Sequence, residues 1–211
     1  MDLSALSEAV IQGNIEKAKE LTQQAVDAGE DPQSLLDQGL IMAMDTVGEN
    51  FAKGLLFVPQ MLRSAKTMQE CLAILQPHFQ AGSVTSKGKI VLGTVKGDLH
   101  DIGKNLVAMM LEGAGFTVVD LGVDVAPEAF VKAVSEEHPN IVGMSALLST
   151  TMPSMADTVR ALSEAGLREA VQIMIGGAPV TAQYAEEIGA DRYAPDAGSA
   201  VIKAKKLVAS A

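Results

Sequence analysis

A histidine between two carboxylates is the most chemically distinctive feature of the sequence. His100 lies in the stretch GTVKGDLHDIGKNL, residues 93–106, with Asp98 two residues before it and Asp101 directly after it. An imidazole ligates a metal better when its second ring nitrogen is hydrogen-bonded to a carboxylate. Asp98 has the spacing for that role, so the stretch indicates a metal-ligating histidine. On spacing alone, a loop histidine beside an unrelated carboxylate is an equally good interpretation.

The glycines of this stretch suggest a phosphate-binding loop, but the other residues exclude one. A P-loop has four residues between its first glycine and the Gly-Lys pair, which Ser or Thr follows. Here five residues separate Gly97 from Gly103. Asn105 stands where a magnesium-binding Ser or Thr belongs, and the two carboxylates would repel phosphate. We therefore exclude nucleotide hydrolysis.

Two other catalytic patterns also fail. The segment GMSAL, residues 143–147, faintly resembles a nucleophile elbow, but a hydrolase of that fold has its histidine after the serine. All three histidines of this chain precede Ser145. The histidines are isolated and the chain has a single cysteine, so no local zinc-ligand cluster is expected.

The remaining histidines and the cysteine have structural interpretations. His78 and His138 lie at apparent helix ends, where the helix dipole favours a surface histidine. Cys71 adjoins an apolar stripe and is expected in the core or at its boundary. A single cysteine excludes an internal disulfide and suits a reducing cytosol.

Composition and charge exclude several classes of partner. The chain has 211 residues, 48% of them hydrophobic, and a formal charge of −10. This charge, together with the lack of a basic run, argues against nucleic-acid binding. The first residues, MDLSALSEAV, lack the pattern of a signal peptide, and no apolar run approaches the roughly 20 residues of a membrane span. We expect a cytoplasmic protein without a membrane or nucleic-acid partner.

Residues 1–80 predict four helices with one apolar face each, a helical bundle. Breaks are expected at residues 13–14 and 29–32. The apolar stripes, spaced by three or four residues, are Leu3, Leu6 and Val10; Ile15, Ala18, Leu21 and Ala25; Leu36, Leu40, Met44, Val47 and Phe51; and Met61, Ala65, Met68, Leu72, Leu75 and Phe79.

Residues 81–88 are small and polar and predict a linker, after which residues 89–211 predict a second domain of the α/β class. Short β-rich runs alternate there with amphipathic helical ones, which indicates a flavodoxin-like, doubly wound, five-stranded parallel sheet with helices on both faces. Pro127 and Pro153 suit the first turns of two of these helices. The expected strands are 89–95, 116–122, 140–146, 171–177 and 191–194, and the expected helices 104–114, 126–137, 153–165, 180–188 and 196–209.

This architecture predicts where a ligand binds. Open α/β sheets bind ligands beyond the carboxyl ends of their strands, where the strand order reverses. In a flavodoxin-like order that point lies between strands 1 and 3. The loops expected there are 96–103 and 146–152, with 176–180 as a neighbour.

The residues in these loops resemble a known family. Residues 98–103, DLHDIG, resemble the D-x-H-x-x-G signature of base-off, His-on cobalamin-binding domains. Residues 145–147 resemble that family's S-x-L motif, and the glycines at 176–177 its third motif. Residues 47–68 are similar to the cap domain before the cobalamin domain of methionine synthase. Nearly the whole chain resembles the small corrinoid proteins of methylamine-, methanol- and betaine-type methyltransferase systems.

The resemblance assigns roles to individual residues. It implies that His100 is the lower axial ligand of cobalt, that Asp98 accepts the other imidazole N–H, and that Thr151, where relatives often have Ser, extends the relay. Ser145, Leu147 and Ser149, the last a departure from Thr, would line the channel for the nucleotide tail. The implied cofactor-binding residues are Gly97, Asp98, His100, Asp101, Ile102, Gly103, Ser145, Leu147, Ser149, Gly176, Gly177, Phe51, Val58 and Asp37.

Three of these residues lie in the predicted bundle. Phe51 and Val58 match positions that cover the methyl face of the cofactor, with Val replacing the commoner Leu, and Asp37 matches an acidic position on that face. Phe51 is equally well explained as a bundle-core residue, because it belongs to an apolar stripe. Gly176 and Gly177 would let the nucleotide tail run against bare backbone.

The function implied by the resemblance is that of a methyl carrier, which is not an enzyme on its own. The cofactor would be cobalamin, methylcobalamin in the loaded state. The partners would be a substrate-specific methyltransferase and an acceptor methyltransferase that uses a thiol or tetrahydrofolate, and the resemblance also allows a reductive activase. The alternatives are a cobalamin-dependent regulator, which would need a DNA-binding segment, and the cobalamin subunit of a mutase, which usually lacks the cap. The sequence leaves the methyl donor and acceptor open.

Overall fold

The computed structural model describes residues 3–78 and 86–209. The chain forms two compact units, one of residues Met1–Ser86 with Gly113–Gly115 and one of residues Lys87–Glu112 with Phe116–Ala211. Most of the linker predicted at 81–88 lies outside the described residues, as does Phe79, the last residue of the fourth apolar stripe. The two units are described separately below.

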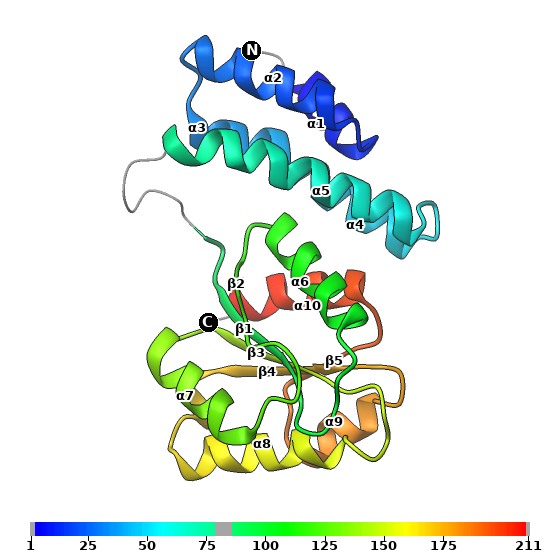
Figure 1. The fold of residues 1–211 in the computed structure, drawn as a ribbon, viewed down its shortest axis with the longest axis vertical. Coiled ribbons are helices and arrows are strands. Elements are labelled where there is room, and N and C mark those ends of the chain that lie inside the picture. Colours follow the sequence, from blue (N-terminus) through cyan, green and yellow to red (C-terminus); the bar gives the residue numbers. More distant parts are fainter. Residues whose placement is uncertain (1–2, 79–85, 210–211) are drawn as a thin grey trace. The chain divides into compact units, whose positions relative to one another are not determined.

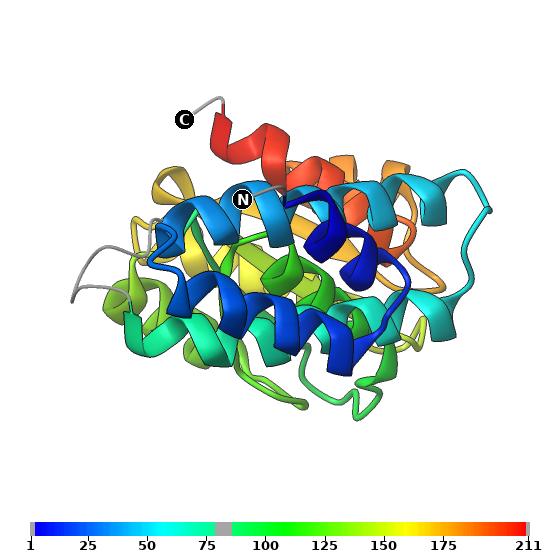
Figure 2. The ribbon, with the colours of Figure 1, turned by 90° about the horizontal axis from the view of Figure 1, so that it is seen from above.

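The first unit is helical (Figure 1). Helix α2 lies along α5, as Figure 2 also shows. Two side chains of α5 bond to the end of α1 and the turn that follows it: Arg63 Nε donates to the Gly13 carbonyl and Ser64 Oγ to that of Ile11. Cys71 is fully buried on α5, and His78 is exposed, as predicted. The segments are α1 (Ser4–Ile11), α2 (Ile15–Asp27), α3 (Pro32–Ser34), η1 (Leu35–Ile41), α4 (Met42–Ala52), α5 (Val58–Leu75) and η2 (Gln76–His78).

One segment of this unit departs from the predicted regular α-helix. Residues Leu35–Ile41 form a π-helical turn, in which the Met42 N–H donates to the Asp37 carbonyl five residues earlier. Gly39 lies inside it, and a Cβ there would be 2.9 Å from Leu6 Cδ2, so α1 approaches the backbone closely. Ser7 Oγ also donates to the Gly39 carbonyl at 2.8 Å. A π-helical turn holds one residue more than an α-helical turn. With this extra residue the helix makes the close contact of Gly39 with α1 and still keeps Leu36 and Leu40 buried.

The second unit confirms the predicted sheet. Its five strands are parallel, in the order β2-β1-β3-β4-β5, and the order reverses between β1 and β3. The central strands β1, β3 and β4 are almost wholly buried, as parallel strands covered on both faces must be. The strands are β1 (Lys89–Thr94), β2 (Thr117–Asp120), β3 (Ile141–Ser145), β4 (Gln172–Gly176) and β5 (Arg192–Ala194).

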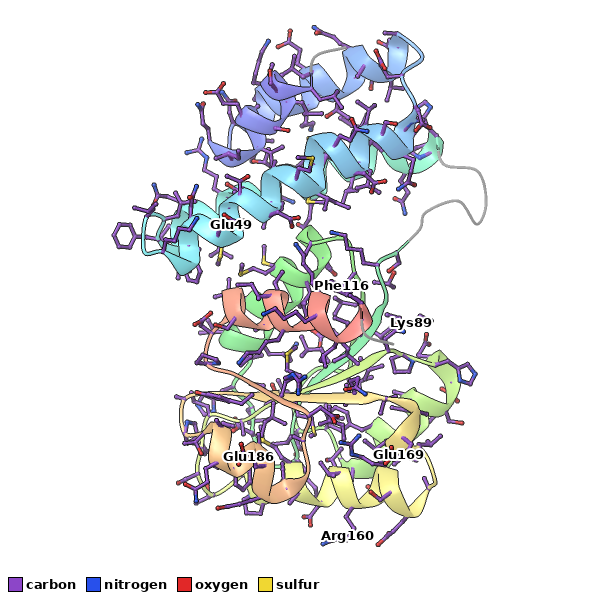
Figure 3. All side chains as sticks on the ribbon, turned by 180° about the vertical axis from the view of Figure 1, so that it is seen from behind. Glu49, Lys89, Phe116, Arg160, Glu169 and Glu186 are labelled. Atoms are coloured by element: carbon purple, nitrogen blue, oxygen red, sulfur yellow. The ribbon has the colours of Figure 1, made fainter. Side chains whose placement is uncertain are left out.

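Helices cover both faces of this sheet, with α7, α8 and α9 on one and α6 and α10 on the other (Figure 1). Pro127 and Pro153 begin α7 and α8, as predicted, and His138 is an exposed residue at the end of α7. Each helix buries one face: Met155 and Leu162 of α8 are in the core, while Arg160 points outward (Figure 3). The helices are α6 (Ile102–Gly113), α7 (Pro127–Glu137), α8 (Pro153–Glu164), α9 (Ala182–Ile188) and α10 (Ala197–Ala209).

One helix boundary differs from the prediction. Helix α6 begins at Ile102, two residues before the predicted start, so Ile102 and Gly103 belong to its first turn and not to a loop.

Across residues 3–78 and 86–209, the structure contains no helix with the length and apolar character that crossing a bilayer requires.

Candidate functional site

Strand pairing brings the predicted loops to one edge of the sheet. Thr94, the last residue of β1, pairs with Ser145, the last of β3, and Ser145 pairs with Gly176 at the end of β4. Backbone bonds continue past the strand ends, because the Val95 N–H donates to the Ser145 carbonyl and the Ala146 N–H to the Gly176 carbonyl. The three motif-bearing loops therefore start side by side at the switch point.

The His100 imidazole is fixed by Asp98. Asp98 Oδ1 lies 2.8 Å from His100 Nδ1 and accepts the His100 backbone N–H at 3.0 Å. The Thr94 hydroxyl donates to the His100 carbonyl at 3.0 Å, which ties the loop back to β1. The His100 side chain keeps 51% of its surface exposed, whereas that of Asp98 is wholly buried. The imidazole is thus anchored at one nitrogen, and about half of the side chain is exposed.

Asp98 is a buried carboxylate surrounded by hydrogen-bond donors. Its Oδ2 accepts the backbone N–H groups of Leu147 and Leu148, at 2.8 and 3.2 Å, and lies 2.7 Å from the Thr151 hydroxyl oxygen. Burial by itself raises the pKa of Asp98, but the bonds from Thr151, His100 and Leu147 outweigh it and hold that pKa well below its usual range. Asp98 is therefore ionised at neutral pH.

An ionised Asp98 determines which imidazole nitrogen carries the proton. The carboxylate only accepts hydrogen bonds, so the neutral ring must hold its proton on Nδ1. This leaves the Nε2 lone pair free to bind a metal, as the second nitrogen of a carboxylate-bonded imidazole commonly does. The arrangement presents one nitrogen ligand with a fixed direction.

Thr151 links Asp98 to the loop after β3. Its hydroxyl oxygen lies 2.7 Å from Asp98 Oδ2 and 2.8 Å from the Leu148 carbonyl oxygen. A hydroxyl has one proton, so Thr151 donates to one of these two acceptors at a time. The predicted group of Asp98, His100 and Thr151 is thus brought together in space.

The other predicted residues of the His100 loop have different surroundings. Gly97 has a φ of +83°, a left-handed conformation suited to glycine. Asp101 accepts from the Asn105 amide at 3.0 Å, so it belongs to the start of α6 and not to the His100 contacts. The Ile102 side chain is 87% exposed, and a Cβ on Gly103 would have no neighbour within 4 Å.

The glycine pair at the end of β4 is required by the packing of the protein itself. A Cβ on Gly176 would lie 2.8 Å from the Ala194 carbonyl oxygen, and one on Gly177 only 1.9 Å from that of Ala146. Gly177 also has a φ of +128°. Gly176 thus permits the close approach of β4 to β5, and Gly177 that of the loops after β4 and β3, while the role of both glycines toward a nucleotide tail stays a prediction.

The other predicted cofactor-binding residues divide between the two units. In the second unit, Ser145 is half-buried at the end of β3, and Leu147 and Ser149 are exposed in the loop that follows. In the helical unit, Phe51 is half-buried on α4 and Val58, 40% exposed, begins α5. Asp37 is exposed in the π-helical turn, where it accepts from the Gln33 amide at 3.0 Å. The roles of all these residues toward a cofactor stay predictions.

Three contributions to the site were not predicted. Leu148 acts through its backbone N–H, which no side-chain pattern reveals. Lys104, which directly follows the D-x-H-x-x-G motif of residues 98–103, is buried and forms an ion pair with Asp120 at the end of β2. Asp124 forms hydrogen bonds with the Gly97 N–H and the Asp98 carbonyl. Its sequence signal is an acidic residue at the same edge of the sheet, after β2.

Comparison with known proteins identifies the family. A family model described as a B12 binding domain matches residues 88–202, and a second model with the same description matches residues 3–76. Trimethylamine corrinoid protein 2 of Methanosarcina mazei is 44% identical over 192 residues, which cover 90% of this chain and 88% of the relative.

Solved structures agree. The methanol:cobalamin methyltransferase complex MtaBC from Methanosarcina barkeri contains a chain 31% identical to this one, with a TM-score of 0.90 over 99% of this chain and 80% of that one. A cobalamin-binding protein from Desulfitobacterium hafniense is 33% identical, with a TM-score of 0.83 over 98% of both chains. The chain belongs to the B12-binding corrinoid proteins of methyltransferase systems. This confirms the resemblance inferred from the three motifs.

The residues at this edge of the sheet fit a corrinoid. They offer a metal one nitrogen ligand, His100 Nε2, whose direction is fixed by Asp98. A single protein ligand suits a metal ion whose other ligands come from a macrocycle. Exposed apolar side chains near His100 add the surface that a large organic ring would cover. These side chains are Leu99, Ile102, Leu147 and Leu148, which are between 42% and 87% exposed.

We expect Gly177→Ala to destabilise the second unit. Its Cβ would overlap the Ala146 carbonyl oxygen in a backbone conformation unsuited to alanine, at a cost of about 1–3 kcal/mol or more. The control is Gly103→Ala, where space is open in the first turn of α6 and stability should be unchanged or rise by up to about 1 kcal/mol. Urea unfolding followed by circular dichroism measures both; equal stabilities would contradict the packing argument.

We expect Asp98→Asn to destabilise the protein in a pH-dependent way. Because the folded pKa of Asp98 is lowered, its carboxylate contributes stability that is complete above the unfolded value of about 3.9 and is lost as the pH falls through the folded value. The difference between wild type and variant, about 1.5–3 kcal/mol at pH 7, should therefore shrink in acid.

The control for this prediction is Asp157→Asn, which changes a carboxylate in a surface ion pair with Arg160 and should shift stability by less than about 1 kcal/mol. Urea unfolding at neutral and acidic pH measures both variants. A difference between wild type and Asp98→Asn that does not depend on pH would show that the Asp98 charge is not what stabilises the loop.

Proposed function

We propose that this chain is a methyl carrier that works through a bound corrinoid. Its cobalt accepts a methyl group from a substrate:corrinoid methyltransferase and passes it to a second methyltransferase that uses a thiol or tetrahydrofolate acceptor. The observation that carries the proposal is the His100 imidazole, held at Nδ1 by the buried Asp98 at the switch point of a B12-binding fold. When bound, the corrinoid supplies the cobalt centre that takes up and releases the methyl group.

His100 is the proposed axial ligand, through Nε2, and Asp98 keeps the proton on Nδ1 and orients the ring. The Leu147 and Leu148 N–H groups and the Thr151 hydroxyl stabilise the carboxylate. The lowered pKa of Asp98 keeps its carboxylate ionised, so Nε2 is the nitrogen of this group that would hold a metal or a proton.

Further residues are proposed to hold the cofactor. On the second unit these are Gly97, Asp101, Ile102 and Gly103 around the His100 loop, with Ser145, Leu147, Ser149, Gly176 and Gly177 for the nucleotide tail. On the helical unit they are Phe51, Val58 and Asp37. The exposure of Ile102, Leu147 and Val58 supports this assignment, since a large apolar side chain left open to water is free to cover a ligand.

The proposed partners are a substrate-specific methyltransferase, an acceptor methyltransferase and a reductive activase, in the cytoplasm. The support is that relatives carry methylamine names and that a similar chain was solved within a methanol:cobalamin methyltransferase complex. The chain itself would supply no substrate site. The compound that donates the methyl group is then a property of the partner enzyme.

Reconstitution with hydroxocobalamin tests the proposal. The wild type should retain stoichiometric corrinoid after gel filtration, and His100→Ala should change its visible spectrum because the axial nitrogen is lost. The control is His138→Ala, an exposed histidine at the far end of α7, which should behave as the wild type. A wild type that stays colourless, or a His100→Ala spectrum identical to that of the wild type, would contradict the proposal.

A further inference from the structure

Asp124 has a backbone conformation that its position does not explain. Within residues 3–78 and 86–209, only Asp124 and His138 are non-glycine residues with a positive φ, of 52° and 47°. His138 ends α7, where a left-handed residue is common. Asp124 ends no helix and lies between β2 and α7. Aspartate is one of the few residues that tolerate this conformation, and outside such a context the contacts that hold it there are of interest.

Asp124 makes two hydrogen bonds to the backbone that carries Asp98. Its N–H donates to the Asp98 carbonyl at 2.9 Å, and its Oδ1 accepts the Gly97 N–H at 2.7 Å. Both its backbone and its carboxylate therefore face the same two consecutive residues. The next residue along, Val125, continues the contact through a parallel bridge to Val95.

These bonds act on the part of the chain that determines the position of His100. Asp98 orients the imidazole, so a shift of the Asp98 backbone moves the carboxylate and the ring together. The loop is also held by the Thr94 hydroxyl at the His100 carbonyl and by the Ser154 hydroxyl at the Lys96 carbonyl. Asp124 holds the middle of this loop from the segment after β2, through the Gly97 N–H and the Asp98 carbonyl.

Burial does not account for the Asp124 bonds. Asp124 is exposed, so water could solvate its carboxylate without help from Gly97. The opposite end of β1 has a comparable pair of bonds: the Asn140 N–H donates to the Lys89 carbonyl, and Asn140 Oδ1 accepts the Lys89 N–H, both at 2.8 Å. Asn140 has no positive φ, and its bonds hold no residue of the candidate site. It is therefore a matched comparison for the bonds of Asp124.

We propose that Asp124 is a positioning residue for His100, acting through the backbone of Gly97 and Asp98 so that the imidazole presents Nε2 in one direction. This inference rests on the proposed function for the idea that Nε2 binds a metal. The effect of Asp124 on the orientation of the His100 ring does not depend on that function and can be measured without cofactor. Asparagine can replace the aspartate, because it tolerates the left-handed region and keeps an acceptor oxygen. Alanine and glycine cannot, because they lack the acceptor.

The first test uses the full chain without cofactor. Long-range ¹H–¹⁵N spectra of the imidazoles, recorded at a pH at which the spectra themselves show neutral rings, report which nitrogen carries the proton. His100 should show the Nδ1–H form alone in the wild type and in Asp124→Asn. It should show a mixture of the two forms in Asp124→Ala and Asp124→Gly. The glycine variant adopts the positive φ without a side-chain clash, so the change it tests is the loss of the acceptor oxygen.

The second test measures hydroxocobalamin binding by the same proteins. Asp124→Gly should bind about 10–100-fold more weakly than the wild type, the usual loss when a residue that orients a ligand is removed, and Asp124→Asn should bind as the wild type does. Asn140→Ala removes a similar side-chain oxygen from a backbone N–H at the far end of β1, and should change neither readout.

The outcomes separate the two proposals. An Asp124→Gly protein with the wild-type His100 spectrum and wild-type binding overturns the positioning role, as does an Asn140→Ala protein that loses both to the same degree. A wild type that fails to bind hydroxocobalamin overturns the proposed function, while the imidazole spectra of the cofactor-free chain still decide the role of Asp124.

Discussion

A carboxylate removed from water needs donors to replace its hydration, and Asp98 obtains five. Two come from His100, two from the backbone of the loop after β3, and one from Thr151. Because the bonds from these neighbours hold its pKa low against the effect of burial, Asp98 stays ionised and fixes the proton of His100 on Nδ1. The chemistry available at this edge of the sheet depends on that one buried charge.

The fold provides the donors. A parallel order with its reversal between β1 and β3 places the loops after these strands side by side, so that Leu147 and Leu148 can point their N–H groups at Asp98. Gly177 lets the loop after β4 approach that after β3 more closely than any side chain allows. The sheet thus acts as a rigid support, and the variable chemistry lies in loops held at its carboxyl edge.

Much of this arrangement could be predicted from the sequence. Alternating β-rich and amphipathic runs predicted the order of strands and helices, because these patterns follow directly from backbone periodicity. The spacing of Asp98 and His100 was compatible with their pairing, but it was the resemblance to a known family that favoured the pairing over an unrelated neighbouring carboxylate. The π-helical turn at Leu35–Ile41 could not be predicted, since it results from the close approach of α1 at Gly39. Backbone donors such as the Leu148 N–H leave no side-chain pattern in the sequence, and the acidic side chain of Asp124 does not reveal its left-handed backbone conformation.

The central claim is that His100 Nε2 binds the cobalt of a corrinoid. The most direct measurement is electron paramagnetic resonance of the reconstituted protein in its cobalt(II) form, prepared with natural and with ¹⁵N-labelled histidine. A single axial imidazole nitrogen should split each cobalt line into three in the unlabelled protein and into two in the labelled one, and His100→Ala should lose this dependence. A splitting that does not change with the histidine label would show that the axial nitrogen comes from the cofactor, and would contradict the account.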